Sequence, residues 1–327
     1  MSLIKFPSTT PKKIVETKLM KQTISRTLAV HPLGALVIWY GASRIGKTTT
    51  AQYMVAKILE AHDANDPFAF RAAYCEVGEI PPWSGNEMKK GIKSLYFAAF
   101  RSNLDERVYR RDPPEAVAAL LVHELQKRNI QMIFLDEAGG LSIDAIQGMI
   151  LVRDTAFSMH WPLTLVLIGM DDLPVKVNRK SQIKGRISEW CYFVEYGFDD
   201  TWNLLTELHP HFAGLDKNNE EHREQVEFLR TTYGGFPGLL ISFIVRMEYR
   251  LQDHKNLIDL RFLRAVHLLT ARDMQRSIEH SLTHFKGMAL NKASKRAATI
   301  ARVDPEEGTN KDDRQKRPKN ANKRKSA

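Results

Sequence analysis

The sequence predicts an α/β fold: a parallel sheet with helices on both faces, followed by a smaller region made only of helices. Three observations support this expectation. Short apolar runs alternate with helical patterns up to about residue 198, as expected for strands that are buried on both faces of a parallel sheet. Only helical patterns follow over 199–284. The last stretch, 286–327, is rich in charge and poor in apolar residues, which predicts disorder.

The first strand is expected at 35–40, where an apolar run stops at Gly41, and a helix over 47–61 follows it. The sequence Asp112-Pro-Pro-Glu115 resembles an N-cap with prolines in the first turn and predicts the start of a helix. The remaining strands are expected at 69–77, 130–135, 163–168 and 190–194. The remaining helices are expected at 116–128, 142–157, 199–209, 220–232, 237–252 and 259–284.

These elements suggest four segments along the chain. They are a basic N-terminal extension (1–32), an α/β domain (33–198), a small helical lid domain (199–285) and a disordered basic tail (286–327). The net charge of +10 is distributed unevenly, with +5 in the N-terminal segment, +8 in the tail and −3 in the remaining chain. An excess of basic residues indicates an anionic partner such as nucleic acid. Here that attraction resides mainly in the two ends.

Composition excludes several classes of protein. With 327 residues, 43% of them hydrophobic, the chain can bury a substantial core. Its longest apolar stretch, 161–170, is much shorter than the roughly 20 residues of a membrane-spanning helix. Because no apolar segment follows the N-terminal lysines, we expect no secretory signal. The two cysteines, Cys75 and Cys191, are too few for a disulfide framework. We therefore expect a cytoplasmic protein that does not interact with membranes.

A phosphate-binding motif follows the first expected strand. The pattern GxxxxGK[ST] occurs between a buried strand and a helix, which is the context that a P-loop requires. Backbone N–H groups of such a loop surround phosphates, while its lysine contacts the β- and γ-phosphates and its threonine binds Mg²⁺. The residues expected to bind the nucleotide are Gly41, Ala42, Ser43, Arg44, Ile45, Gly46, Lys47, Thr48 and Thr49.

Two carboxylates follow the strand expected at 130–135. Asp136 and Glu137 would emerge at its carboxyl end, where open α/β sheets bind ligands. We expect Asp136 and Thr48 to hold Mg²⁺, and Glu137 to act as the general base that polarises the attacking water. Adjacent acids of this kind are typical of ATPases and argue against Ras-type GTPases and kinases. ATP and Mg²⁺ are therefore the expected ligands.

Two further positions are candidates for nucleotide sensing. Asp171 follows the strand at 163–168 and could contact the nucleotide as a sensor, or it could cap the next helix. Arg186 precedes the last expected strand and could be an arginine finger that enters a neighbouring ATP site, with Arg179 as the second choice. An arginine supplied in trans would couple hydrolysis to oligomerisation. The alternative for both arginines is a solvated basic helix face.

With these motifs in place, the chain resembles the AAA+ ATPases, and within them the TniB/TnsC family of transposition regulators, especially the TnsC of CRISPR-associated transposons. The resemblance covers about residues 10–285. It depends on the overall layout and on the segments GASRIGKTTT, WSGNEMKKGIKSLYF, IFLDEA, LTLVLIGMDDL and GGFPGLL. One departure is the glycine-rich segment 234–238, where the family often has a sensor arginine. Arg246, two turns further on, is either a substitute or a surface residue.

The resemblance implies an ATPase that assembles as rings or filaments on duplex DNA without sequence preference. It also implies partners, namely transposase subunits and a TniQ-type target selector, in a bacterial cytoplasm. Lys89, Lys90 and Lys93 lie where the family grips DNA and are the expected DNA contacts, with a solvated helix face as the alternative. Two other functions remain open, a general AAA+ remodeller such as a helicase loader and a scaffold NTPase that uses nucleotide as a switch.

Overall fold

The computed structural model describes residues 14–63, 69–82, 85–104, 111–251 and 258–270. The chain divides between His267 and Leu268 into two units, and all features below belong to the first. Its strands are β1 (Leu36–Gly41), β2 (Arg71–Glu76), β3 (Ile130–Asp136), β4 (Thr164–Gly169) and β5 (Ile187–Phe193). The helices around the sheet are α1 (Lys18–Val30), α2 (Lys47–Asp63), α3 (Glu87–Phe100), α5 (Pro114–Lys127), α6 (Ile143–Ser158), α7 (Asp172–Asn178) and α8 (Ser181–Lys184). Those of the lid domain are α9 (Phe198–Leu208), α10 (Pro210–Ala213), α11 (Glu220–Thr232) and α12 (Pro237–Leu251).

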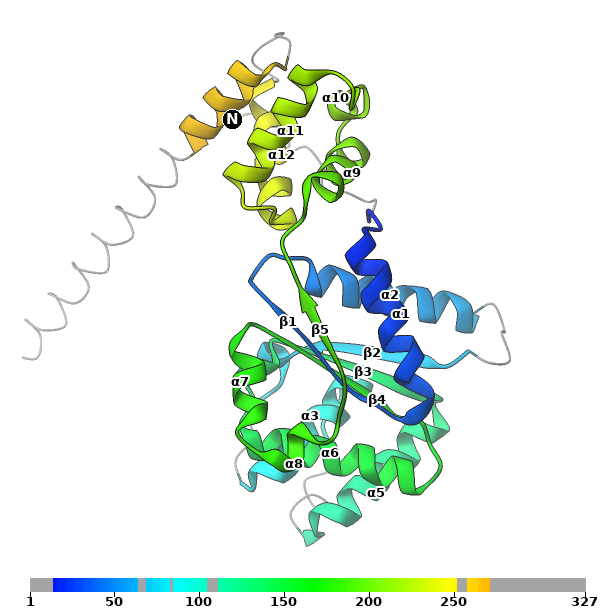
Figure 1. Cartoon of the computed structure of the whole chain (residues 1–327). Coiled ribbons are helices and arrows are strands. Elements are labelled where there is room, and N and C mark those ends of the chain that lie inside the picture. The colour runs from blue at the N-terminus through cyan, green and yellow to red at the C-terminus, as the bar shows by residue number, and fades with distance from the viewer. Residues whose placement is uncertain (1–13, 64–68, 83–84, 105–110, 252–257, 271–327) are drawn as a thin grey trace, which may run out of the picture. The chain divides into compact units, whose positions relative to one another are not determined.

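The five strands form one parallel sheet in the order β2-β3-β4-β1-β5 (Figure 1). This confirms the predicted α/β class with a parallel sheet. Strand β1 lies between β4 and β5, and β3 lies between β2 and β4. Because all strands are parallel, the segments that follow β1, β3 and β4 emerge at the same edge of the sheet. The phosphate-binding loop and the predicted acidic residues follow these strands.

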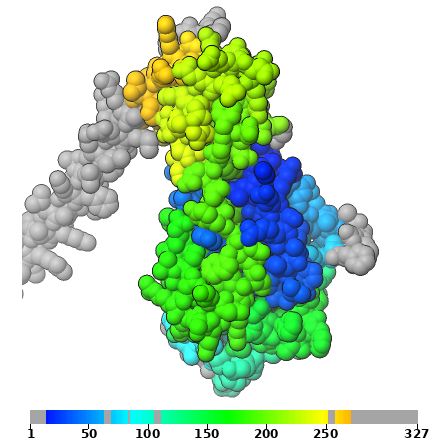
Figure 2. All heavy atoms as spheres, viewed as in Figure 1, coloured from blue at the N-terminus to red at the C-terminus, as the bar shows by residue number. Residues whose placement is uncertain are grey.

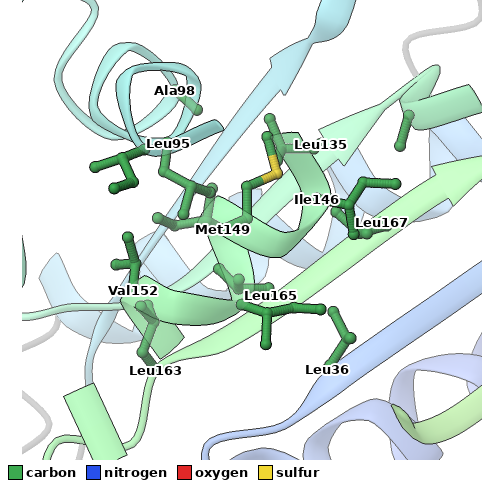
Figure 3. Close-up of a cluster of buried hydrophobic side chains, with 14 of the residues drawn as sticks. Leu36, Leu95, Ala98, Leu135, Ile146, Met149, Val152, Leu163, Leu165 and Leu167 are labelled. Atoms are coloured by element: carbon green, nitrogen blue, oxygen red, sulfur yellow. The ribbon is translucent and has the colours of Figure 1, made fainter. Parts of the chain in front are cut away.

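Helices cover both faces of the sheet, as predicted (Figure 1). Alternate residues of β1 point to opposite faces: Leu36 and Ile38 belong to one buried cluster, and Val37 and Trp39 belong to another. The first cluster includes side chains of α3, α5 and α6 and is shown in Figure 3, where Met149 of α6 lies between sheet and helices. The second includes side chains of α2. Burial on both faces explains why β1 is an almost continuous apolar run.

Helices α3 and α6 cross with their backbones in close contact. A Cβ atom on Gly91 of α3 would lie 1.9 Å from the carbonyl oxygen of Ala145 in α6. A Cβ atom on Gly148 of α6 would lie 1.9 Å from the carbonyl oxygen of Met88 in α3. The two glycines thus allow an approach that any side chain at either position would prevent.

The lid domain has a separate core. Buried side chains from α9 to α12 and from residues 258–266 form a cluster that includes Trp202, Phe212, Leu229 and Phe243. Among the described helices, no single one is long and apolar enough to cross a membrane. Only α11 and α12 taken together, a pair bent by 118°, reach the length and apolar composition of a membrane span.

Helix α1 was not predicted, and it lies within the N-terminal segment that we expected to be a basic extension. Met20, Thr23 and Thr27 are its buried residues, and the Nε1–H of Trp39 donates a hydrogen bond to Thr27 Oγ1 at 3.1 Å. The helix also packs against β5, and Figure 2 shows it in dark blue at the surface beside later, green parts of the chain.

Two predicted boundaries were wrong. Helix α5 begins at Pro114 with Pro113 at the N-cap, and among the described residues no side chain caps it, so Asp112 is not the cap. Strand β5 begins at Ile187, three residues before the expected start. The predicted disordered tail, 286–327, lies outside the described residues.

Candidate nucleotide-binding site

The loop after β1 has the backbone geometry of a P-loop. Gly41 and Gly46 have φ values of +146° and +100°, which favour glycine. A Cβ atom on Gly41 would also lie 2.5 Å from the carbonyl oxygen of Phe193 in β5. The loop leads into α2, which begins at Lys47. Its backbone N–H groups and the amino end of a long helix therefore meet at one point, as phosphate binding requires.

The Lys47 ammonium lies inside this loop. Its side chain is 8% exposed, and Nζ donates hydrogen bonds to the carbonyl oxygens of Gly41 at 2.8 Å and Ala42 at 2.7 Å. Burial lowers the pKa of Lys47, and the negative charges of Asp136 and Asp171 oppose this shift. The ammonium group is thus placed where a phosphate held by the loop would face it.

Asp136 connects the end of β3 with the P-loop. Its Oδ2 atom accepts a hydrogen bond from Thr48 Oγ1 at 2.6 Å and another from the Tyr74 hydroxyl at 3.0 Å. The predicted pair of Thr48 and Asp136 is therefore in contact, although the two residues are 88 positions apart in the chain. A hydroxyl and a carboxylate are oxygen ligands of the kind that Mg²⁺ prefers, so the donor set fits this ion.

Glu137 has a left-handed backbone conformation. Its φ is +56° and ψ is +33°, and its N–H donates to Asp136 Oδ1 at 2.8 Å. Non-glycine residues with such φ values are uncommon and occur preferentially at functional sites. The Glu137 side chain is exposed.

Asp171 lies at the same edge of the sheet, between β4 and α7. It occupies the N-cap position of α7, but its φ and ψ are helical and, among the described residues, its side chain makes no capping hydrogen bond. The capping alternative is therefore not what the structure shows. The Asp171 carboxylate is near enough to Lys47 to act on its pKa.

A cavity of about 610 Å³ opens beside the P-loop. The loop residues Arg44 to Thr50 line one side of it. The other lining residues come from the N-terminal segment, from the end of β5 and from the lid, and most of them are apolar. They include Ile14, Val15, Met20, Tyr196, Leu204, Leu208, Pro237 and Ile241. An apolar wall next to a phosphate-binding loop suits the base and sugar of a nucleotide.

The glycine-rich segment 234–238 lies directly against the P-loop. The Gly238 N–H donates to the Arg44 carbonyl oxygen at 3.1 Å, and a Cβ atom on Gly238 would lie 2.9 Å from Arg44 Cβ. A larger residue at 238 would therefore push the lid away from the loop. Arg246 is exposed and does not belong to the described residues that line the cavity.

Arg186 lies far from this site in its own chain. It immediately precedes β5, whereas the P-loop begins at Gly41, which pairs with Phe193 at the other end of β5. Seven residues of strand separate the two ends by roughly 23 Å. The Arg186 guanidinium is half-exposed and forms an ion pair with Asp154 of α6. Any contact between Arg186 and a nucleotide would have to involve the site of another copy.

The three lysines expected to bind DNA lie on α3 in different environments. Lys93 is 3% exposed, so the structure places it inside the domain and not on a surface that duplex DNA could reach. Lys89 and Lys90 are partly exposed in the first turn of α3, and Lys90 forms an ion pair with Glu87. Of the three, only Lys89 and Lys90 remain candidates.

Sequence reasoning missed three parts of the site. It did not identify the apolar lining of the cavity, it did not identify Tyr74 as a partner of Asp136, and it did not identify Lys176. Lys176 of α7 donates to the carbonyl oxygens of Gly139 and, at 2.8 Å, Leu141, and so braces the segment after Glu137. For Tyr74 a sequence signal existed, because residues 74 and 76 of the expected strand share a face, which places the phenol beside the carboxylate of Glu76 at the end of that strand.

Within the described residues, no group of three or more His, Cys, Asp and Glu side chains could hold a metal ion.

No protein-family model matches this chain, and no curated protein matches it in sequence. Solved structures do match. They include the ORC2 protein of Aeropyrum pernix in ADPNP–ADP complexes, with a TM-score of 0.54 at 17% identity over 76% of this chain and 65% of that one. They also include Cdc6p of Pyrobaculum aerophilum, with a TM-score of 0.53 at 18% identity over 75% and 65%.

The ORC1 protein of Aeropyrum pernix in complex with DNA is also similar, with a TM-score of 0.50 at 16% identity over 82% of this chain and 68% of that one. The chain spans about two thirds of the length of these proteins. At such low identity the likeness concerns the fold alone, and the α/β domain with a parallel sheet followed by helices is the fold that the sequence predicted.

Proposed function

We propose that this protein is a Mg²⁺-dependent ATPase of the AAA+ type that binds duplex DNA as an oligomer and regulates DNA transposition. The observation that carries the proposal is the hydrogen bond between Thr48 and Asp136 close to Lys47, where Lys47 and Thr48 line a largely apolar cavity. The ORC2 neighbour was solved with ADPNP and ADP, which supports adenine nucleotides as ligands. Lys47→Ala should abolish nucleotide binding, measured by titration with a fluorescent ATP analogue.

The residues of the site have separate tasks in hydrolysis. Lys47 and the loop N–H groups bind the phosphates, and Thr48 and Asp136 would hold Mg²⁺, which when bound neutralises charge on the β- and γ-phosphate oxygens. Glu137 accepts a proton from the attacking water. Glu137→Gln keeps the shape of the side chain but removes the base. It should therefore retain ATP binding and lose hydrolysis, and unchanged phosphate release would contradict this assignment.

Arg186 is proposed to act on the nucleotide of a neighbouring copy, because its own P-loop is at the opposite end of β5. The test uses two variants that should each be inactive alone. Arg186→Ala has an intact site but supplies no arginine, and Glu137→Gln supplies the arginine but has no base. A mixture of the two should recover ATPase activity. If the mixture stays as inactive as its components, Arg186 does not act in trans.

DNA is proposed to contact Lys89 and Lys90 of α3. The ORC1 neighbour was solved in complex with DNA, which supports nucleic acid as a ligand of this fold. Each lysine that contacts a phosphate contributes about 0.9 to the slope of log K against log salt concentration. Lys89→Gln and Lys90→Gln should each reduce that slope by about this amount. Lys57→Gln, which changes an exposed lysine on α2, serves as the control and should leave the slope unchanged.

Assembly is tested by electron microscopy and sedimentation with ATP, Mg²⁺ and duplex DNA. The proposal predicts rings or filaments that require ATP and form on DNA of arbitrary sequence, and it fails if only monomers are found. Its partners are proposed to be transposase subunits and a TniQ-type target selector. One alternative is a helicase loader. Binding to a replicative helicase instead of a transposase would support that alternative.

A further inference from the structure

The Asp136 carboxylate is held by three hydrogen-bond donors. Oδ1 accepts from the Glu137 N–H at 2.8 Å, while Oδ2 accepts from both Thr48 Oγ1 at 2.6 Å and the Tyr74 hydroxyl at 3.0 Å. The first donor is the adjacent backbone, and the second is itself an expected Mg²⁺ ligand. Tyr74 is therefore the one member of this set to which the ATPase reaction described above gives no role.

The position of Tyr74 is set by the sheet. It lies on β2 opposite Phe134 of β3, and Glu76 lies opposite Asp136, so the phenol reaches diagonally along the sheet to the carboxylate. The Tyr74 carbonyl oxygen accepts a hydrogen bond from Arg101 at 2.7 Å. Strand pairing and this bond fix the backbone from which the side chain projects.

The Tyr74 hydroxyl acts as a donor. Burial and the nearby Asp136 charge raise the pKa of Tyr74 far above its usual value, so the group keeps its proton. Glu76 Oε1, at 3.2 Å, is a second acceptor for the same proton. The hydroxyl can therefore stabilise the Asp136 carboxylate by donating a hydrogen bond to it.

We propose that Tyr74 is a positioning residue that increases Mg²⁺ affinity by holding Asp136 Oδ2 toward Thr48. The inference rests on the proposed ATPase function. If a bound Mg²⁺ replaced the hydrogen bond between Thr48 and Asp136, the Tyr74 hydroxyl would still be available to hold Asp136 Oδ2. Loss of hydrogen bonds that orient metal ligands typically weakens metal binding by roughly 10- to 100-fold.

The test is Tyr74→Phe, which keeps the ring and removes the hydroxyl. Binding of a fluorescent ATP analogue is measured against Mg²⁺ concentration and again in EDTA. We expect half-maximal Mg²⁺ to rise by roughly 10-fold, with analogue affinity in EDTA unchanged. Tyr53→Phe is the matched control, because its hydroxyl donates to a different carboxylate, that of Glu16, and it should not alter the Mg²⁺ dependence.

A second comparison uses Asp136→Asn. In that background Tyr74→Phe should have no further effect on Mg²⁺ dependence, because the group that it positions is already altered. An unchanged or lower half-maximal Mg²⁺ in Tyr74→Phe would overturn the inference. So would an equal loss of affinity in EDTA, which indicates a purely structural role. Failure of the wild-type protein to bind the analogue at all would instead refute the proposed function.

Discussion

The crossing of α3 and α6 makes a strong prediction about stability. Gly148→Ala would place a methyl carbon 1.9 Å from the Met88 carbonyl oxygen, whereas real contacts of this kind essentially never fall below 3.0 Å. The obstacle is backbone and not a flexible side chain. The helices must therefore separate by about 1 Å, and this disturbs the cluster that both helices form over the sheet.

Two opposing terms set the size of the effect. Overpacking of this kind costs about 1 to 3 kcal/mol, and the loss of contact along a whole helix pair places it near the upper end. Alanine is favoured over glycine within a helix by about 1 kcal/mol. The net expectation is a loss of about 2 kcal/mol in the free energy of unfolding. Gly91→Ala should behave similarly, and the double variant should lose less than the sum, because the first substitution already separates the helices.

Denaturant titration of each variant measures these values. Gly185→Ala is the control: its backbone is helical, with φ −69° and ψ −8°, and a Cβ atom there would be 3.6 Å from the Ser181 carbonyl oxygen. It should stay within about 0.5 kcal/mol of the wild type. If Gly148→Ala is as stable as the wild type or more stable, helix propensity outweighs the contact and the reasoning is refuted.

Three further variants test other features. Thr27→Val should lose about 1 to 3 kcal/mol in denaturation because the buried Trp39 N–H loses its acceptor, and Thr27→Ser should lose clearly less. Gly235→Ala should lose about 2 kcal/mol, since φ is +69° and a Cβ atom would be 2.5 Å from the Tyr196 carbonyl oxygen; Gly214→Ala is its control, and equal stability would contradict the steric argument. Burial lowers the pKa of His31, so on acidification this histidine binds a proton at a higher pH in the unfolded chain than in the folded protein. The free energy of unfolding should therefore decrease as pH falls below about 6.5. Denaturation between about pH 5 and 7 should show a smaller decrease in His31→Gln, and an identical slope would exclude His31 as a source.

The sequence predicted the central part of the fold because burial leaves a local pattern. In β4, for example, every residue is buried, and the strand is apolar after its first residue, Thr164. The edge strand β5 alternates between exposed and partly buried residues over its first half, and its start was misplaced for that reason. Helix α1 was missed because two of its three buried residues are threonines, Thr23 and Thr27. Their burial depends on partners such as Trp39, which a local pattern does not contain.

The candidate site likewise contains residues that local sequence predicts and others that it does not. Lys47, Thr48, Asp136 and Glu137 belong to short motifs whose spacing reflects contact with one ligand, and local sequence is sufficient to find them. The apolar cavity wall is assembled from three separate parts of the chain, so no spacing records it. The burial of Lys93 was not foreseen, because helical periodicity in a lysine-rich segment does not show which of its lysines is buried.

The placement of Arg186 and the P-loop at opposite ends of β5 has a consequence for any assembly in which the arginine serves a neighbour. Each copy then supplies its arginine at one face and receives a neighbour's arginine at another. Contacts between copies are therefore head-to-tail, and the assembly has a direction. In a closed ring every nucleotide would have an arginine beside it. In an open chain one terminal copy would have none and would keep its ATP longest. Interior copies would then hydrolyse their ATP before the terminal copy does. As an open assembly ages, ADP would accumulate in its interior while ATP persists at that one end.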